Sequence, residues 1–408
     1  MPEIAPFAGL RYRVPDAELT KVLAPPYDVI PPSYQDELYA RDPRNIVRVV
    51  LNREPGDEAY RAAGDTWRRL QADGVVAADD APSLYVVEQT FAAEGAALVR
   101  LGLFARFRAT DASAGQVLPH EHTRAAAKED RYKLLKATRA NFSPIFLMSE
   151  DPGGRFAAAL AAATAGTPVA TYTDDAGVAH RLWRVTDARA IAGFQQALGK
   201  PKAYIADGHH RYATALRYRD EVARDGEWTF GYFTPLDSPG MLVLPYHRLL
   251  VEGPSLAEAR ERLLGAFLVN DSADAASAAR EAAQSTMPYA FALAEPGGRA
   301  LVAEALPEAE DLLPQDAHPS LKALDTFFVH KVVLPRLGLD DGAVRYVHSL
   351  AEAKESLAHA RCRLALLLRA TPVRQIVDVA EAKESMPAKS TFFHPKLPSA
   401  LVVHPLLA

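Results

Sequence analysis

The chain has 408 residues, of which 49% are hydrophobic and 24% are charged, and this composition excludes intrinsic disorder as the main state. Domains usually hold about 100–200 residues, so the length predicts two or three domains. The 46 Lys and Arg residues stand against 51 Asp and Glu residues, which gives a net charge of -5. This balance excludes a global basic field that would attract nucleic acid or an anionic membrane, and any phosphate site must be local.

Cysteine usage and the apolar runs bear on the cellular location. The single cysteine, Cys362, excludes a disulfide framework and a cysteine-based zinc site, and it fits a reducing compartment. The sequence starts without a basic stretch that leads into an apolar one, and none of its apolar runs reaches about 18 residues. We therefore expect a cytoplasmic protein without a membrane partner.

The first part of the chain alternates irregular and regular stretches. The paired prolines at 25–26 and 31–32 exclude a helix there, because proline lacks a backbone donor and restricts the residue before it. Residues 45–51 are rich in β-branched side chains and favour a strand. Residues 57–72 carry apolar side chains at helical spacing, which predicts an amphipathic helix.

Strand patterns dominate the next stretch. Residues 83–91 and 98–109 predict the two strands of a hairpin. Residues 130–139 favour a helix, and residues 143–148 favour a buried strand.

The last part of the chain predicts further strands and helices. Residues 228–236 and 241–251 favour strands, and residues 289–305 favour a hairpin. Two helices are expected within residues 324–362, followed by a buried strand or helix. The tail over 386–405 contains too many prolines for a regular element.

A first polar turn reads Leu-Pro-His-Glu-His-Thr at 118–123 and follows a predicted strand. Its histidines, His120 and His122, flank Glu121, and such groups bind a cation or act as a general base. The i, i+2 spacing on a turn does not force both imidazoles onto one metal, and the helical spacing of a zinc protease motif is missing. A solvated polar loop is the alternative.

A second polar turn reads Asp-Gly-His-His-Arg at 207–211 and joins a short predicted strand to a predicted helix. Gly208 permits a tight turn, and the amides at a helix N-terminus are a natural seat for phosphate. Arg211 can fork onto phosphate oxygens, and an imidazole can donate another hydrogen bond.

Asp207 stands just before this turn. It can accept a proton from a substrate hydroxyl or hold Mg²⁺. In the alternative reading, Asp207 only caps the helix, and His209 and His210 are packed or solvated.

Two further basic stretches are candidates for an anion site. Lys128 and Arg131 lie on a predicted helix, one side of which can line such a site, and Asn141 follows it; the alternative is a solvated, ion-paired face. In the tail, Lys389 and Lys396 flank Ser-Thr-Phe-Phe-His-Pro without the glycine-rich loop of a Walker motif. A phosphate contact and a docking arm are both open there.

Five long motifs together resemble one bacterial and archaeal family, the domain-of-unknown-function 1015 family. They are LAPPYDVI (23–30), LPHEHT (118–123), KEDRYKLLKATRANFSPIF (128–146), ADGHHRYATAL (206–216) and MPAKSTFFHPKL (386–397). The resemblance spans nearly the whole chain. LPHE followed by DGHHR also resembles the core of the ParB/sulfiredoxin-like superfamily, which includes ParB, sulfiredoxin and free-serine kinases.

This second resemblance implies a nucleotide phosphate site. Sulfiredoxin needs a cysteine in its turn and this chain has none there, whereas the kinases pair a glutamate in a PHE motif with an aspartate in a DGHxR-like motif. Glu121 and Asp207 match those positions and would activate the substrate hydroxyl. His209, His210 and Arg211 would hold the transferring phosphate.

The remaining candidate residues are assigned to contacts with nucleotide or substrate. For nucleotide or phosphate they are Gly208, His120, Lys128, Arg131, Lys389 and Lys396, and for substrate they are Tyr27, Asp28 and Asn141. The expected nucleotide is ATP, with ADP or CTP as alternatives, together with Mg²⁺. No metal ligand is firm, and Asp207 is the candidate for Mg²⁺.

The leading hypothesis is therefore a small-molecule kinase that phosphorylates a hydroxyl group, with free L-serine as the acceptor. One alternative is a non-enzymatic, ParB-like nucleotide-binding module. Another is a metal-dependent hydrolase or nuclease with ligands from His120, His122, His209 and His210. The net charge makes nucleic acid an unlikely partner.

The expected fold is a mixed α/β arrangement in three regions. Residues 1–95 form an N-terminal α/β segment, and residues 96–250 form a ParB/sulfiredoxin-like core that carries the LPHE and DGHHR motifs. Residues 251–408 form a C-terminal α/β portion whose tail returns toward the site.

Overall fold

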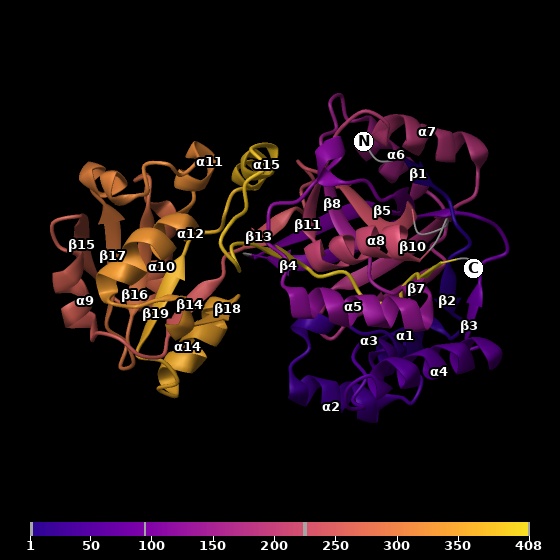
Figure 1. Ribbon diagram of the computed structural model, residues 1–408, viewed down its shortest axis with the longest axis horizontal. Coiled ribbons are helices and arrows are strands. Elements are labelled where there is room, and N and C mark those ends of the chain that lie inside the picture. Colours follow the sequence, from indigo (N-terminus) through magenta and orange to yellow (C-terminus); the bar gives the residue numbers. More distant parts are fainter. Residues whose placement is uncertain (1–2, 94, 223–226, 407–408) are drawn as a thin grey trace. The chain divides into compact units, whose positions relative to one another are not determined.

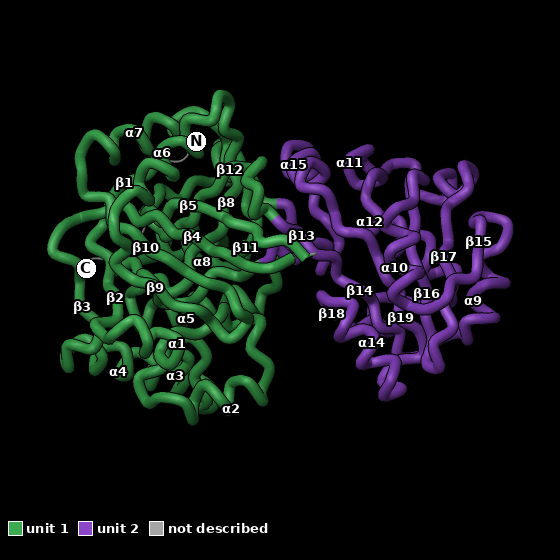
Figure 2. The backbone as a smooth tube through the Cα atoms, turned by 180° about the vertical axis from the view of Figure 1, so that it is seen from behind, with its two compact units in different colours: residues 1–119, 123–241, 395–408 green, residues 120–122, 242–394 purple. Residues whose placement is uncertain are grey.

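The computed structural model describes residues 3–93, 95–222 and 227–406, and the chain forms two compact units (Figures 1 and 2). Unit 1 consists of residues 1–119, 123–241 and 395–408, and unit 2 consists of residues 120–122 and 242–394. Both units combine helices with sheets, so the expected mixed α/β fold class is confirmed.

The centre of unit 1 is a sheet in which nine strands are described. Its strands are β1 (Ile4–Ala5), β4 (Leu84–Ala93), β5 (Ala96–Arg108), β6 (Val117–Leu118), β8 (Ile145–Ser149), β9 (Ala170–Thr173), β10 (Ala179–Val185), β11 (Ala203–Asp207) and β12 (Trp228–Pro235). They run in the order β6-β11-β8-β12-β5-β4-β10-β9, and β1 pairs with β5. The pairs β6–β11 and β8–β12 are parallel, and the other pairs are antiparallel.

Helices and two small strand pairs complete unit 1. The helices are α1 (Asp16–Val22), α2 (Pro32–Arg41), α3 (Val47–Val50), α4 (Glu58–Ala72), α5 (Ala125–Thr138), α6 (Arg155–Ala163), α7 (Ala188–Leu198) and α8 (His209–Glu221). The small pairs are β2 (Leu10–Tyr12) with β3 (Val76–Ala78), and β7 (Ala140–Asn141) with β21 (His404–Pro405). Helices α6 and α7 cover part of the sheet, because Phe156, Leu160, Phe194 and Leu198 join its buried core.

Unit 2 is built on a six-stranded antiparallel sheet in the order β15-β17-β16-β19-β14-β18. Its strands are β14 (His247–Leu250), β15 (Phe267–Ser272), β16 (Ala290–Ala294), β17 (Ala300–Ala305), β18 (Val344–Val347) and β19 (Leu364–Leu368), and β13 (Leu242–Leu244) pairs separately with β20 (Phe392–His394). Its helices are α9 (Leu256–Leu263), α10 (Ala275–Gln284), α11 (Pro319–Lys322), α12 (Asp325–Phe328), α13 (Leu334–Leu337), α14 (Leu350–Ala358) and α15 (Val373–Glu381). Small side chains let α10 approach the sheet closely, since Ala278 and Ala282 are buried in its core.

Most elements with a clear period form as expected. The proline pair at 31–32 does not exclude a helix, however, because α2 begins at Pro32, and a proline is tolerated in the first turn of a helix. The helix predicted over 57–72 is α4, and the predicted hairpin is β4 and β5, while Glu94 lies outside the described residues. The hairpin predicted over 289–305 is β16 and β17. The strand-to-helix step around residue 207 is β11 followed by α8.

The strand predicted over 45–51 is wrong, because Val47–Val50 forms the short helix α3. The reason lies in Asn45, whose side-chain oxygen accepts from the Val47 amide at 2.8 Å while its amide group donates to the Lys21 and Leu23 carbonyls. These bonds fix a helical turn, and the valines are buried by packing rather than by sheet pairing.

The tail also differs from the expectation. Residues 386–405 contain two short strands despite their prolines: β20 lies between Pro387 and Pro395, and β21 ends at Pro405. No helix among the described residues combines the length and apolar character needed to cross a membrane.

Candidate functional site

The turn between β11 and α8 is the structural centre of the candidate site. β11 ends at Asp207, and α8 begins at His209. Gly208 joins them with φ 99° and ψ 28°, a left-handed conformation that is unfavourable for residues with a Cβ atom. The glycine therefore sets the direction in which the helix leaves the strand.

Asp207 binds two cations that come from different parts of the chain. Its Oδ2 accepts from Arg211 Nη2 at 2.5 Å, and its Oδ1 accepts from Lys396 Nζ at 2.7 Å. The Asp207 side chain is 20% exposed, so the ion pairs are partly shielded from water. The C-terminal segment of unit 1 thus supplies a lysine to a carboxylate 189 residues earlier.

Two opposing effects set the ionisation of Asp207. Burial acts to raise the pKa of Asp207, but the charges of Lys396 and Arg211 outweigh burial and hold this pKa well below its ordinary value. The carboxylate is therefore ionised at neutral pH, and it is a weak base while both cations stay bound to it.

A buried clamp in the sheet positions Lys396. Gln89 on β4 donates from its amide to the Lys396 carbonyl at 3.1 Å, and Arg100 on β5 donates to the Pro395 carbonyl at 2.5 Å. Arg100 also donates to the Gln89 side-chain oxygen at 2.5 Å, and both side chains are fully buried. The backbone of the lysine is thereby fixed on the sheet while its ammonium reaches Asp207.

The two histidines of the turn have different surroundings. His209 is buried, with 4% of its surface exposed, whereas His210 is half-buried and its Nε2 accepts from the Arg124 amide at 2.9 Å. Arg124 directly precedes α5, so this bond ties the start of α5 to the start of α8. Arg211 also donates to the Pro144 carbonyl next to β8.

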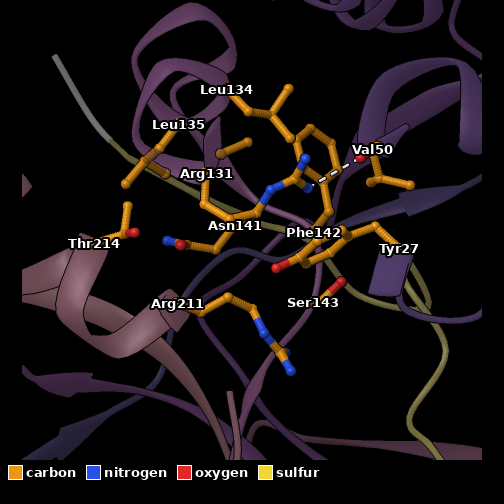
Figure 3. A pocket seen from close by; sticks show the side chains of 11 residues that line it. Tyr27, Val50, Arg131, Leu134, Leu135, Asn141, Phe142, Ser143, Arg211 and Thr214 are labelled. Carbon is orange, nitrogen blue, oxygen red and sulfur yellow. Dashed lines mark hydrogen bonds between the residues drawn. The ribbon is translucent and has the colours of Figure 1, made fainter. Parts of the chain in front are cut away.

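A pocket lies against this turn within unit 1 (Figure 3). Its lining residues border about 470 Å³ of space, a volume that includes open solvent. Its wall contains the expected residues Tyr27, Arg131, Asn141 and Arg211, together with Val50, Leu134, Leu135, Ala140, Phe142, Ser143 and Thr214. Four of the residues selected from the sequence thus share one cavity.

Arg131 is firmly oriented in this pocket. Its guanidinium lies 3.8 Å from the centre of the Tyr27 ring, donates to the Val50 carbonyl at 3.0 Å and binds the Asp130 carboxylate. Burial raises the pKa of Tyr27 against the opposing charges of Arg131 and Arg211, so the phenol is neutral at physiological pH.

Two other predicted residues do not line the pocket. Asp28 follows Tyr27 in a 3₁₀ turn over Tyr27–Val29 and is exposed. Lys128 lies on α5, where its carbonyl accepts from the Thr214 hydroxyl at 3.4 Å.

The first motif is divided between the units, because Leu118, Pro119 and Thr123 belong to unit 1 and residues 120–122 belong to unit 2. Residues 120–122 contact the tail there: the His120 carbonyl accepts from the Met386 amide at 2.8 Å, and Glu121 forms a parallel bridge with Met386. His120 is buried and His122 is exposed. Glu121 is thus assigned to unit 2 and Asp207 to unit 1.

Lys389 is also in unit 2 and has φ 59°, an uncommon conformation for a residue other than glycine. Its ammonium lies 5.2 Å from the centre of the Tyr246 ring. Lys389 and Lys396 are thus in different units. Within the described ranges, no three His, Cys, Asp or Glu side chains gather as a metal-binding group would require.

Sequence reasoning missed Gln89, Arg100, Ser143 and Thr214. A signal for Arg100 was available, since an arginine interrupts the apolar strand pattern at 98–103, and a charged residue in a buried strand needs a specific partner. The hydroxyl groups of Ser143 and Thr214 carry no local signal of this kind.

Comparison with solved structures finds distant similarities. A free serine kinase variant in complex with AMP is 15% identical over 74% of this chain and 92% of that chain, with a TM-score of 0.38. A conserved hypothetical protein from Pyrococcus furiosus is 14% identical over 74% and 95%, with a TM-score of 0.36. SbnI with a C-terminal truncation from Staphylococcus aureus is 10% identical over 70% and 85%, with a TM-score of 0.37.

No curated protein matches the chain. A family model described as "Protein of unknown function (DUF1015)" matches residues 4–327, which is most of the sequence. The chain therefore belongs to the DUF1015 family, as its five long motifs indicated.

Proposed function

We propose that the protein is a nucleotide-dependent kinase for a small hydroxylated metabolite, with ATP and Mg²⁺ as the donor and free L-serine as the first acceptor to test. The observation that supports this proposal is the convergence of Asp207, Arg211 and Lys396 at the N-terminal end of α8. Phosphoryl transfer depends on such charges and on positioning more than on covalent chemistry of the protein.

The donor phosphates would bind at the start of α8. The first amides of a helix lack intrahelical acceptors and carry the positive end of the helix dipole, which favours an anion. α8 has 13 residues, and Gly208 brings no side chain between its first turn and a ligand. Arg211 and Lys396 would add charge-assisted bonds to phosphate oxygens.

Binding of a nucleotide would also change the state of Asp207. Phosphate oxygens compete with the carboxylate for Lys396 and Arg211, so Asp207 regains oxygen lone pairs for Mg²⁺ or for a substrate hydroxyl. The ion pairs then act as a resting state that keeps the carboxylate ordered before the donor arrives.

Glu121 is proposed as the second carboxylate of the reaction. It stands three residues before Arg124, whose amide is bonded to His210, and three residues of chain span at most about 11 Å. This limit from covalent geometry supports the role that the family resemblance assigns to Glu121.

The proposed step balances as an in-line displacement. The acceptor hydroxyl oxygen forms a bond to the γ-phosphorus while the bond from that phosphorus to the β–γ bridging oxygen breaks. The hydroxyl proton passes to Asp207 or Glu121, and ADP leaves with the electron pair of the broken bond.

The test is mass-spectrometric detection of phosphoserine, with ATP, ADP and CTP supplied separately to the purified full-length protein. Asp207→Asn and Glu121→Gln each remove a charge with little change in shape, and we expect losses of about 10²–10⁴-fold. Asp111→Asn is the matched control, because Asp111 pairs with Arg219 on the same helix α8 but is exposed at the surface.

Glu121→Gln should keep the thermal stability of the parent chain within a few degrees, whereas Asp207→Asn should lower it, because it removes the carboxylate that Arg211 and Lys396 share. Absence of any phosphorylated product from serine and from a pool of other hydroxylated metabolites would contradict the proposal. If nucleotides still bound under those conditions, the ParB-like binding module would replace it.

A further inference from the structure

The pocket against the turn between β11 and α8 offers both hydrogen-bond donors and hydrogen-bond acceptors to a ligand. The donors belong to Tyr27 and Arg131, and the acceptors belong to Asn141 and Thr214. We propose that this pocket binds the head group of a free α-amino acid, with the carboxylate on the donors and the ammonium on the acceptors. The inference rests on the proposed kinase function for what happens to the bound amino acid, and it deepens that function by assigning the residues that select the acceptor.

Tyr27 and Arg131 have hydrogen atoms left for a ligand. Among the described contacts the Tyr27 hydroxyl makes no hydrogen bond, and burial raises the pKa of Tyr27, so the phenol keeps its proton. Arg131 donates from Nε and Nη2 to the Asp130 carboxylate and from Nη1 to the Val50 carbonyl. A guanidinium carries five N–H groups, so one remains on each terminal nitrogen.

These two donor groups are held together by stacking. The Arg131 guanidinium lies 3.8 Å from the centre of the Tyr27 ring, and its bond to the Val50 carbonyl at 3.0 Å limits rotation over that ring. A carboxylate can accept from the phenol and from a guanidinium N–H at the same time.

Thr214 on α8 can act only as an acceptor toward a ligand. Its hydroxyl has a single proton, which it donates to the Lys128 carbonyl at 3.4 Å, and a carbonyl cannot donate in return. The Thr214 oxygen therefore has lone pairs but no proton for a molecule in the pocket.

Asn141 on β7 presents a second acceptor. Its amide nitrogen contacts Nδ1 of His404 at 3.3 Å, and burial lowers the pKa of His404 to about 3, so this imidazole is neutral. The amide nitrogen donates to the imidazole, and no hydrogen bond among the described contacts uses the Asn141 carbonyl oxygen. That oxygen is left for a ligand.

An ammonium group suits this pair of acceptors better than a hydroxyl group. In Figure 3 the Asn141 amide points toward the Thr214 hydroxyl, and the Tyr27 hydroxyl points toward Asn141 from the other side. An ammonium carries three N–H groups and can donate to both oxygens, whereas a hydroxyl has one proton and leaves one oxygen without a partner. The hydrogen bonds of an ammonium are also strengthened by its charge.

Other ionisable groups of this region are outside the described wall of the pocket. They are Asp28, Asp207, His209 and Lys396 in unit 1 and Glu121 in unit 2. An amino-acid zwitterion has no net charge, so an electrostatic potential over the whole pocket favours one end of the ligand and opposes the other. Selection of the ligand therefore depends on the hydrogen bonds of the wall.

Arg211 links this pocket to the proposed phosphate site. It belongs to the wall and also binds Asp207. The side chain of the bound amino acid would point toward Arg211, so the acceptor class is α-amino acids with a side-chain hydroxyl.

The test is calorimetric binding of four ligands to the full-length protein. L-serine and L-alanine carry the head group, glycerate replaces the ammonium with a hydroxyl, and ethanolamine lacks the carboxylate. We expect glycerate and ethanolamine to bind at least about tenfold more weakly than the two amino acids, because each leaves polar groups of the wall unpaired. L-alanine has no hydroxyl to phosphorylate, so its binding does not depend on turnover.

Variants of the wall separate the two ends of the ligand. Thr214→Val and Asn141→Leu each remove an acceptor and should weaken L-alanine binding about tenfold, with little effect on glycerate. Tyr27→Phe keeps the stacked ring but removes a donor to the carboxylate, so it should weaken L-alanine and glycerate alike.

Two matched controls lose a hydroxyl elsewhere in unit 1. Thr234→Val removes a buried hydroxyl that donates to the Leu101 carbonyl at 2.8 Å, and Tyr34→Phe removes a hydroxyl that donates to Asp175. Neither Thr234 nor Tyr34 is among the described lining residues, and both variants should bind L-alanine like the parent chain.

Each outcome decides between the pocket assignment and the kinase. Glycerate or ethanolamine binding as tightly as L-alanine, or L-alanine binding that Thr214→Val and Tyr27→Phe leave unchanged, would overturn the inference. Binding of L-alanine that depends on Tyr27 and Thr214, without phosphorylation of any hydroxylated amino acid, would support the pocket assignment and count against the kinase. Phosphorylation of serine with an unchanged KM in all three wall variants would overturn the pocket assignment and leave the kinase standing.

Discussion

Two arginines of unit 1 are related to the same short segment of the tail in different ways, one by a direct hydrogen bond and the other through a shared carboxylate. Arg100 is fully buried and donates to the backbone carbonyl of Pro395, whereas Arg211 is 15% exposed and shares the Asp207 carboxylate with the Lys396 ammonium. Arg100 fixes the path of the tail backbone, and Arg211 binds the carboxylate that the lysine of the tail also binds. The contrast distinguishes Arg100, which holds the site together, from Arg211, which a ligand can reach.

The difference follows from what each guanidinium meets. The Arg100 guanidinium lies over the Phe146 ring at 4.7 Å, and burial lowers the pKa of Arg100. The Pro395 carbonyl, the Gln89 side-chain oxygen and the Phe146 ring are neutral groups that contact this guanidinium. Arg211 is paired with a carboxylate at the edge of a pocket, and an anion can compete for that pairing.

The largest effect on stability should come from removing the buried guanidinium of Arg100. Arg100→Met leaves the carbonyls of Pro395 and Gln89 without their donor, and we expect unit 1 to lose about 2–4 kcal/mol of unfolding free energy. Tryptophan fluorescence during urea unfolding measures this loss, because all three tryptophans, Trp67, Trp183 and Trp228, belong to unit 1.

The matched control for Arg100 is Arg181→Met. Arg181 also lies in the sheet, on β10, but its side chain is 53% exposed and its pairing with Glu88 is long at 3.4 Å. We expect a change below about 1 kcal/mol for this exposed pair. Equal stability of the two variants would contradict the role of Arg100 as a buried clamp.

The clamp also marks the limit of prediction from sequence. The turn at Asp207 could be predicted because strand, glycine and helix follow one another within a few residues. The partner Lys396 could not be placed, because a contact over 189 residues depends on the path of the whole chain. A strand was predicted where helix α3 forms, because the valines of α3 are β-branched and favour strands. The hydrogen bonds of the Asn45 side chain override that preference.

The contribution of the Asp207 ion pairs to stability can be tested by changing the pH. The pKa of Asp207 is lower in the folded than in the unfolded state, so its ion pairs stabilise the protein above the unfolded value of about 4, and this contribution is lost as pH falls below it. Lys396→Met should cost about 1–3 kcal/mol at pH 7, and the difference from the parent should shrink at pH 3.

Urea unfolding at both pH values measures this difference. Lys133→Met is the control, since its ion pair with Asp57 is exposed to solvent and its loss should leave the unfolding free energy nearly unchanged at either pH. A difference between Lys396→Met and the parent that is the same at pH 7 and pH 3 would show that the ammonium does not stabilise the Asp207 carboxylate.

The smallest effect on stability should come from the turn itself, at Gly208. An alanine there would adopt φ near 99° and place its Cβ 3.0 Å from Arg211 Cζ, so Gly208→Ala should cost about 1–2 kcal/mol and displace the guanidinium. Gly177→Ala has a similar backbone cost at φ 77°, but nothing lies within 4 Å of its Cβ. If only Gly208→Ala also weakens nucleotide or acceptor binding, then the position of Arg211, rather than backbone strain, is what the ligand requires.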